Sequence, residues 1–313
     1  MELRKAVPLI GLGALLILDA VLIFWAFRPT PAPEVEPSPA VSVSASNAAS
    51  PSASPSESPS QSEAPSALEP APLTRFVAPV SDSAAWVVDS GTCDEVGAVW
   101  STDDSGDTWS VQDGPGLVSR ARPESADTGF VTGGGDGCEL TLWGTGDGGA
   151  SWGDPASAAN AWSRVPDDAT TVHIPSDEVV APCPDEADVV DFSIVSGDRA
   201  DALCADGTAR RTTDGGDTWS TVFTDEAGLS MTVLADGSGV LLRADDGCDG
   251  VVAVPLTDGE PDGDGSCVEG DAEAGKNSVA GSGEAWWLVL GDEVFRASET
   301  GGPWEPTGAA LSG

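Results

Sequence analysis

One stretch of this sequence carries several groups that could do chemistry. Residues 211–220 read RTTDGGDTWS and combine two acids, hydroxyl groups, two glycines and a tryptophan. Carboxylate and hydroxyl oxygens in a short loop can bind a hard metal ion, and a positioned carboxylate can act as a general acid or base. The same residues also suit a tight turn, because Asp accepts hydrogen bonds from turn amides and Gly adopts backbone conformations that other residues avoid.

Near-copies of this stretch favour the turn. TDDSGDTW ends at Trp109, TGDGGASW at Trp152 and TTDGGDTW at Trp219, and all three follow [ST]-x-D-x-G-x-[ST]-W. A fourth copy, ASETGGPW, is degraded. We interpret these residues as structural, because their place in a repeat dictates them. They are Thr102, Asp104, Gly106, Thr108, Trp109, Thr145, Asp147, Gly149, Ser151, Trp152, Thr212, Asp214, Gly216, Thr218, Trp219, Glu299, Gly301 and Trp304.

Short strand-like segments surround each copy. GAVWS (97–101) precedes the first copy, AAWVV (84–88) comes before that, and RFVAPV (75–80) lies farther upstream. After the third copy a fourth segment follows, WSTVF (219–223). Enrichment in β-branched and aromatic residues between Gly and Asp turns predicts strands joined by hairpins.

A repeated four-stranded unit predicts an all-β fold, a β-propeller, over residues 74–313. Five units begin near residues 75, 117, 189, 229 and 278. We expect five blades, with six possible, because the residues between Trp152 and Val189 could hide another strand or form a loop.

The repeated segments resemble Asp-box (BNR) repeats, as found in sialidases, sortilin-type receptors and photosystem II assembly-factor-like propellers. The resemblance covers residues 75–305 and implies that each turn joins the third and fourth strands of a blade, away from the central ligand face. A sialidase would need a tyrosine nucleophile and three arginines, but this chain contains no tyrosine. Arg75 lies where the first arginine motif would fall, yet LTRFVAP lacks the Arg-Ile-Pro core of that motif.

Two further candidates for chemistry are weak. His173 is the only histidine, and nothing near it resembles a nucleophile elbow, so we expect an ordinary structural residue. The acidic stretch 258–269 is nearly in EF-hand register and could bind Ca²⁺, but it lacks flanking helices. We prefer a solvated acidic loop there and predict no cofactor. The possible calcium ligands are Asp258, Glu260, Asp262 and Glu269.

Six cysteines fall in the predicted globular part. An even number in an exported protein predicts three disulfides. We expect sequential pairing, because each such pair spans one repeat or less. The pairs are Cys93 with Cys138, Cys183 with Cys204, and Cys248 with Cys267.

The N-terminus predicts a membrane anchor and a spacer. Residues 6–27 form an apolar run broken only by Asp19, long enough to span a bilayer. Arg4 and Lys5 precede this run, which favours a cytoplasmic N-terminus. We expect residues 1–28 to be a cytoplasmic stub and uncleaved signal anchor, residues 29–73 to be a Pro/Ser/Ala-rich disordered linker, and the propeller to be extracellular.

Charge restricts the partners. The globular part holds 45 of the 52 acidic residues but only 10 of the 13 basic ones. Such a field repels nucleic acid, so none is expected as a partner. We predict a non-enzymatic, single-pass cell-membrane protein whose propeller binds an extracellular protein or glycan. The alternatives are a sialidase-like glycoside hydrolase, which the missing tyrosine disfavours, and an assembly factor for a membrane complex.

Overall fold

The computed structural model describes residues 68–283 and 285–311. These residues form 24 strands and two 3-10 turns. The predicted anchor and most of the predicted linker lie outside the described residues. Within the described part of the chain, no helix has the length and apolar character needed to cross a membrane.

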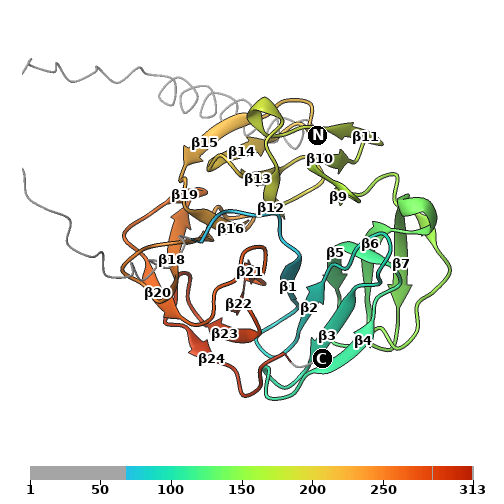
Figure 1. The fold of residues 1–313 in the computed structure, drawn as a ribbon, viewed down its shortest axis with the longest axis horizontal. Helices are drawn as coiled ribbons and strands as arrows, with labels where there is room; N and C mark the ends of the chain where they lie inside the picture. The colour runs from blue at the N-terminus through green and yellow to red at the C-terminus, as the bar shows by residue number, and fades with distance from the viewer. Residues whose placement is uncertain (1–67, 284, 312–313) are drawn as a thin grey trace, which may run out of the picture. The chain divides into compact units, whose positions relative to one another are not determined.

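The strands form six antiparallel sheets, which are the blades of a ring (Figure 1). The all-β propeller is confirmed, but the preferred number of five blades is wrong, because residues 163–180 form an additional blade of three strands. Blade 1 holds β1 (Arg75–Pro79), β2 (Ala85–Asp89), β3 (Ala98–Thr102) and β4 (Ser110–Asp113). Blade 2 holds β5 (Leu117–Pro123), β6 (Gly129–Gly134), β7 (Leu140–Thr145) and β8 (Ala156–Ser157), with η1 (Asp136–Cys138). Blade 3 holds β9 (Ser163–Val165), β10 (Asp168–Ile174) and β11 (Glu178–Val180), followed by η2 (Pro184–Glu186). Blade 4 holds β12 (Val189–Ile194), β13 (Ala200–Cys204), β14 (Thr208–Thr212) and β15 (Ser220–Thr224). Blade 5 holds β16 (Gly228–Val233), β17 (Gly239–Arg243), β18 (Gly250–Thr257), β19 (Glu260–Pro261) and β20 (Ser266–Glu269). Blade 6 holds β21 (Asn277–Gly281), β22 (Trp286–Leu290), β23 (Glu293–Ala297) and β24 (Glu305–Pro306).

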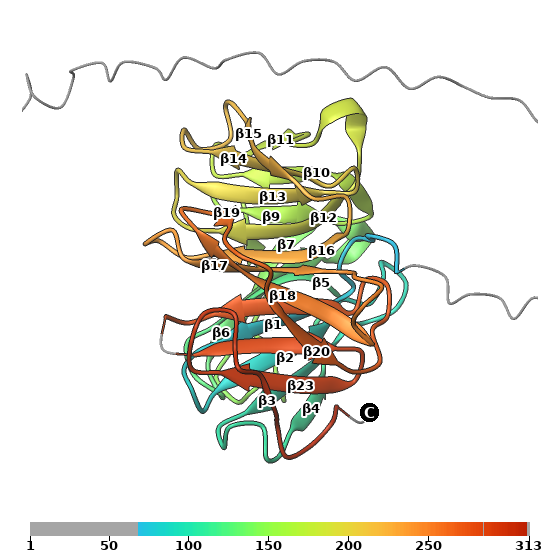
Figure 2. The same ribbon diagram turned by 90° about the vertical axis from the view of Figure 1, so that its left-hand side faces the viewer.

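The strands run from one face of the ring to the other (Figure 2). The three complete repeats follow the third strands β3, β7 and β14, so they lie at one end of the strands, which we call the turn face. The disulfides lie at the opposite end, which we call the disulfide face, because Cys93, Cys138 and Cys248 lie in loops that follow second strands and Cys204 ends β13.

The hydrophobic core lies between blades. Val77, Val87 and Trp100 of blade 1 pack against Trp287 and Val289 of blade 6, and the remaining core clusters are arranged in the same way. A strand buried on both faces must be apolar on both faces, as the fully buried strand WWLVL of β22 illustrates.

Among residues 68–283 and 285–311, blade 3 has no first strand. Its innermost strand, β9, follows Trp162, whose Nε1 donates to the carbonyls of Ser196 and Gly197 in the turn after β12, at the turn face. Pro166, just after β9, packs near Gly134 at the disulfide face. Strand β9 therefore runs opposite to the first strands of the other blades.

Second strands of other blades show the same pattern. Trp86 in β2 and Trp287 in β22 donate to the carbonyls of Ala126 and Ser81, each in the first turn of the next blade. Trp162 occupies the equivalent place, so β9 corresponds to a second strand. The missing first strand leaves space between β9 and β12.

Candidate functional site

A channel runs through the centre of the ring. Its cavity measures about 310 Å³ and is lined by the innermost strands β1, β5, β9, β12, β16 and β21. Most of its lining side chains are small or apolar. Because all six blades contribute, only the closed ring creates this site.

Leu73 closes the channel at the disulfide face. The segment from Leu68 to Leu73 crosses the ring before β1 begins, and it is drawn in blue in Figure 1. The amide of Leu73 donates to the carbonyl of Val190 at 3.0 Å, and its carbonyl accepts from Nη2 of Arg164 at 2.7 Å. Its side chain is buried. A ligand is therefore left with the turn face as its way in.

A side pocket of about 730 Å³ adjoins the channel near the turn face. It lies between β5 and β6 on one side and the end of β12 on the other, beside the position of the missing strand. Phe130, Trp162 and Ile194 supply apolar walls, while Arg120 and Arg122 supply charge. Phe130 is 41% exposed, so one wall is open to solvent.

Three arginines converge on these cavities. Arg120 and Arg122 are two residues apart on β5 and line both cavities, while Arg164 on β9 lines the channel. Within residues 68–283 and 285–311, none of the three forms an ion pair with a carboxylate. This is unexpected in a domain with such an excess of acids, where a basic side chain has many possible partners.

The cost of burial shows in the pKa values. Burial, with repulsion from Arg122, lowers the pKa of Arg120 to about 10. Burial also lowers the pKa of Arg164. Nη1 of Arg120 donates to the carbonyl of Trp162 at 3.0 Å, which is a neutral partner. A bound anion would relieve the repulsion and supply the missing charge.

Asp191 is the only acid among the residues that line the two cavities. Its carboxylate accepts hydrogen bonds from Ser230 Oγ at 2.6 Å and from the amides of Met231 at 2.9 Å and Phe192 at 2.7 Å. Burial raises its pKa, and these hydrogen bonds together with Arg164 offset only part of that rise. Asp191 is therefore already hydrogen-bonded within the protein.

The three complete repeats form the same turn. In each, the first Oδ of the Asp accepts from the amide of the closing Thr or Ser and from the opening Thr, and the second Oδ accepts from the closing hydroxyl. For Asp214, the bonds from Thr218 and Thr212 lower the pKa to about 2. These internal bonds occupy the carboxylates, which supports the interpretation of the turns as structural.

Each repeat tryptophan contacts the preceding blade. Trp109 packs edge-on against Trp287 of blade 6, with ring centroids 6.2 Å apart, and Trp152 packs in the same way against Trp86 of blade 1, at 6.5 Å. Trp219 packs against Trp162 of blade 3 at 6.4 Å. A residue with a Cβ in place of Gly106 would come within 2.7 Å of a side-chain atom of blade 6. We propose that the turns hold neighbouring blades together.

The degraded fourth copy forms no such carboxylate turn in the described residues. Glu299 contributes only its carbonyl, which accepts from the amide of Gly302. Gly301 packs against Pro255 of blade 5, and Trp304 packs on the core between blades 5 and 6. The contact with the preceding blade is therefore kept although the Asp is lost.

The disulfides join Cys93 to Cys138, Cys183 to Cys204 and Cys248 to Cys267, which are the sequential pairs expected. The first of these links blades 1 and 2. The second fastens the segment after blade 3 to β13, and the third joins two parts of blade 5. All three lie away from the side pocket.

The acidic stretch 258–269 is not a helix-flanked loop. It contains β19 and β20, and Thr257 Oγ1 donates to Asp262 at 3.0 Å. Across the described ranges, no three His, Cys, Asp or Glu side chains are grouped to hold a metal ion. His173 is buried, with Nδ1 2.7 Å from the carbonyl of Ala161 and Nε2 3.2 Å from Asp177, so both its ring nitrogens have partners.

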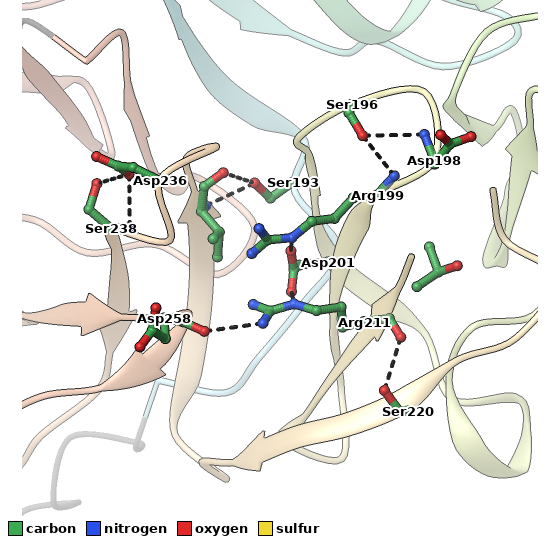
Figure 3. A network of polar contacts seen from close by, with 12 residues as sticks. Ser193, Ser196, Asp198, Arg199, Asp201, Arg211, Ser220, Asp236, Ser238 and Asp258 are labelled. Atoms are coloured by element: carbon green, nitrogen blue, oxygen red, sulfur yellow. Dashed lines mark hydrogen bonds and ion pairs between the residues drawn. The ribbon is translucent and has the colours of Figure 1, made fainter. Parts of the chain in front are cut away.

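A second charged cluster lies between blades 4 and 5 (Figure 3). Asp201 is 1% exposed and lies between two arginines: Arg211 Nε is 2.6 Å from its Oδ1, and Arg199 Nε is 3.8 Å from its Oδ2. Arg211 also donates to the carbonyl of Asp258 in blade 5 at 3.1 Å. Burial raises the pKa of Asp201, and the arginines counteract this rise. Because its acid is already paired, we interpret this cluster as a contact between blades.

The arginine site was not predicted from the sequence. Arg120 and Arg122 come from blade 2 and Arg164 from blade 3, and the three share no motif, so no spacing could have revealed that they converge. The arginine that drew attention, Arg75, lies elsewhere: it is buried between blades 1 and 6 and bonded to Asp89 and Asp292.

The fold and site define a six-bladed β-propeller with an arginine-lined pocket beside its channel. No protein-family model matches the chain, and no curated protein matches it. Among solved structures it is similar to the WD40 propeller domain of Doa1, at 16% identity over 77% of this chain and 82% of that chain, with a TM-score of 0.44. It is also similar to YCF48 bound to a D1 peptide, at 12% identity over 77% and 82% of the two chains, with a TM-score of 0.38.

A xyloglucanase of family GH74 from Xanthomonas campestris is similar at 15% identity over 74% of this chain, with a TM-score of 0.28. The matched region spans only 38% of that enzyme. At these identities and scores none of the similarities assigns a function. The propeller assignment therefore rests on the strand pairing of this chain.

Proposed function

We propose that this chain is a non-enzymatic binding module whose side pocket recognises a carboxylate group of an extracellular partner. The observation that carries the proposal is the convergence of Arg120, Arg122 and Arg164 on the two cavities, where none of them forms an ion pair within the described residues and Asp191 near Arg164 is the only acid in the lining. Arginine binds a carboxylate with two parallel hydrogen bonds, which suits it to this role.

The residues that line the pocket restrict the chemical class of the ligand. Phe130, Trp162 and Ile194 lie beside Arg120 and Arg122, so an apolar group next to the carboxylate would also be bound. A few polar groups placed in a mainly apolar pocket are typical of ligand sites. A compound that carries both groups is the natural probe.

The location is part of the proposal. Three disulfides support an oxidising, extracellular environment. We propose that residues 1–28 anchor the chain in the cell membrane with the N-terminus cytoplasmic, and that the linker holds the propeller away from the bilayer.

A sialidase-like hydrolase is the second candidate, since three arginines and Asp191 meet at one channel. The usual nucleophile of that family is missing, because the sequence has no tyrosine. Asp191 is also tied to Ser230 and to two amides, which leaves it poorly placed to transfer a proton. Assembly of a membrane complex would be one use of a binding module, and no residue here favours it separately.

The test compares 3-phenylpropionate with the neutral 3-phenylpropanamide, by calorimetry on the full chain. We expect the carboxylate to bind at least tenfold more tightly, since one charge-assisted hydrogen bond is worth about 1.5–3 kcal/mol. The salt concentration is kept near 0.15 M, where the Debye length is about 8 Å and the surrounding acids are screened.

Variants locate the site. Arg120→Met and Arg122→Met should each weaken binding of the carboxylate about tenfold. Arg296→Met is the matched control, because Arg296 also forms no ion pair among the described residues but stacks on Trp287 outside the pocket. Equal affinity for the acid and the amide, or equal losses in all three variants, would rule out the proposed site.

A further inference from the structure

The missing first strand of blade 3 leaves a vacant strand position in the ring. On one side lie Trp162 and Arg164, and on the other side lie Asp191 and Ile194 of β12. Strand β9 does not fill this place, because Ser163 Oγ bonds Ser119 Oγ of β5 at 2.8 Å and holds β9 toward blade 2. The channel and the side pocket together occupy the place where the first strand of blade 3 would lie.

One edge of this position can pair with a strand. Strand β12 is the last strand on its side of the sheet of blade 4, so its inner edge has no strand partner. On that edge, Phe192 donates its amide to the side chain of Asp191 at 2.7 Å. A bond to a neighbouring side chain is what an unpaired strand amide uses when no strand lies beside it.

The protein already uses this edge once. The amide of Leu73 donates to the carbonyl of Val190 at 3.0 Å, while the carbonyl of Leu73 accepts from Arg164 on the opposite side. An extended segment of the chain thus occupies the end of the vacant position at the disulfide face. No described residue fills the part near the turn face, which is lined by Arg120 and Arg122.

We propose that an extended peptide segment of a partner protein, carrying an acidic side chain, enters from the turn face and pairs with the inner edge of β12. It extends the sheet of blade 4 by strand addition and fills the place left by the first strand that blade 3 lacks, with its acid on the arginines. This inference rests on the proposed function for the choice of an acidic side chain. The backbone pairing is a separate claim, and it selects a polypeptide over a glycan.

The test uses the full chain and the peptide acetyl-Val-Glu-Val-Thr-amide as probe. Three analogues are compared: one with glutamine in place of glutamate, and two with a single N-methyl group on alternate amides. Only amides on one edge of a strand point toward its neighbour, so one N-methyl analogue should lose at least about tenfold in affinity and the other should bind as the parent does. The glutamine analogue should lose about tenfold.

The outcomes separate the two claims. If both N-methyl analogues bind as tightly as the parent peptide, strand addition is overturned, whatever the glutamine analogue does. If the glutamine analogue binds as the parent does but one N-methyl analogue fails, strand addition stands and carboxylate recognition falls. If the parent peptide does not bind while 3-phenylpropionate does, the pocket takes a carboxylate without strand addition, and this inference is abandoned.

Discussion

Nη1 of Arg75, in the first strand of the ring, lies 2.5 Å from Oδ1 of Asp292 in its last blade. The same atom donates to the carbonyl of Gly291 at 2.7 Å, and Nε and Nη2 bind the two oxygens of Asp89. Burial opposes the charge on Arg75, but the bonds to Asp89 and Asp292 outweigh it and raise the pKa. No strand is shared between the first and last blades in the described residues, so this contact helps to close the ring.

Arg75→Met should therefore destabilise the fold. Asp89 would lose its partner in a partly buried place, and we expect a loss of about 2–3 kcal/mol in the free energy of unfolding, measured in urea. Asp292→Asn is the comparison, with a loss below about 1 kcal/mol, because the Asp292 side chain is 64% exposed. A loss for Asp292→Asn as large as that for Arg75→Met would contradict the larger share assigned to the pair of Arg75 with Asp89.

The cluster around Asp201 makes a second stability prediction. Arg211→Met leaves the buried carboxylate with only the distant Arg199, and should cost about 3 kcal/mol. The double variant Asp201→Asn with Arg211→Met should recover part of that loss, because the unpaired charge is gone. Additive losses in a double-mutant cycle would contradict the pairing.

The turns should respond to acid. The folded pKa of Asp214 is lowered to about 2 from an ordinary value of 3.8, so the stability it contributes is complete above pH 4 and is lost as the pH falls through 2. Asp214→Asn should lower the urea midpoint at pH 6, and its difference from the unaltered protein should shrink toward pH 2. A difference that does not change with pH would show that the charge plays no part.

Asp191 should behave in the opposite way. Its folded pKa is raised, so protonation favours the folded state, and stability is lost as the pH rises through the folded pKa. Asp191→Asn should stay within about 1 kcal/mol of the unaltered protein at pH 7, since the lost hydrogen bond and the removed burial cost offset each other. As the pH falls, the free energy of unfolding of the unaltered protein should rise relative to that of the variant, as measured in parallel urea titrations.

The same variant should bind anions more tightly. Asp191→Asn removes the only carboxylate that lines the cavities, so the affinity for 3-phenylpropionate should rise a few-fold. An unchanged affinity would place the bound carboxylate away from Asp191, in the outer part of the side pocket.

The disulfide beside blade 3 should matter to stability. Replacing Cys183 and Cys204 together by Ala opens a short loop and should lower the free energy of unfolding by about 3 kcal/mol. Blade 3 has only three strands, so its amides should exchange with solvent faster than those of blade 6 in this variant. Uniform exchange across the blades would show that the bond has no local effect.

Local patterns alone determined much of this protein. The repeated TDDSGDTW, TGDGGASW and TTDGGDTW turns fixed the positions of three hairpins, because Asp104, Asp147 and Asp214 bond residues only four positions away. Cysteine spacing indicated the pairs for a similar reason, since each pair joins parts of the same blade or of adjacent ones. Blade 3 could not be predicted from the sequence, because it has no repeat turn and its strand β9 is only three residues long.

Only the tertiary structure decided where a ligand could bind. Arg120 and Arg164 are 44 positions apart in sequence and meet because β9, the innermost strand of blade 3, lines the channel beside β5 of blade 2. Leu73 becomes the closure of the channel only when the ring brings Val190 and Arg164 to either side of it. The turns form through hydrogen bonds between residues close in sequence, so a local pattern predicts them. The channel and its pocket depend on how six blades pack, and no local pattern encodes that packing.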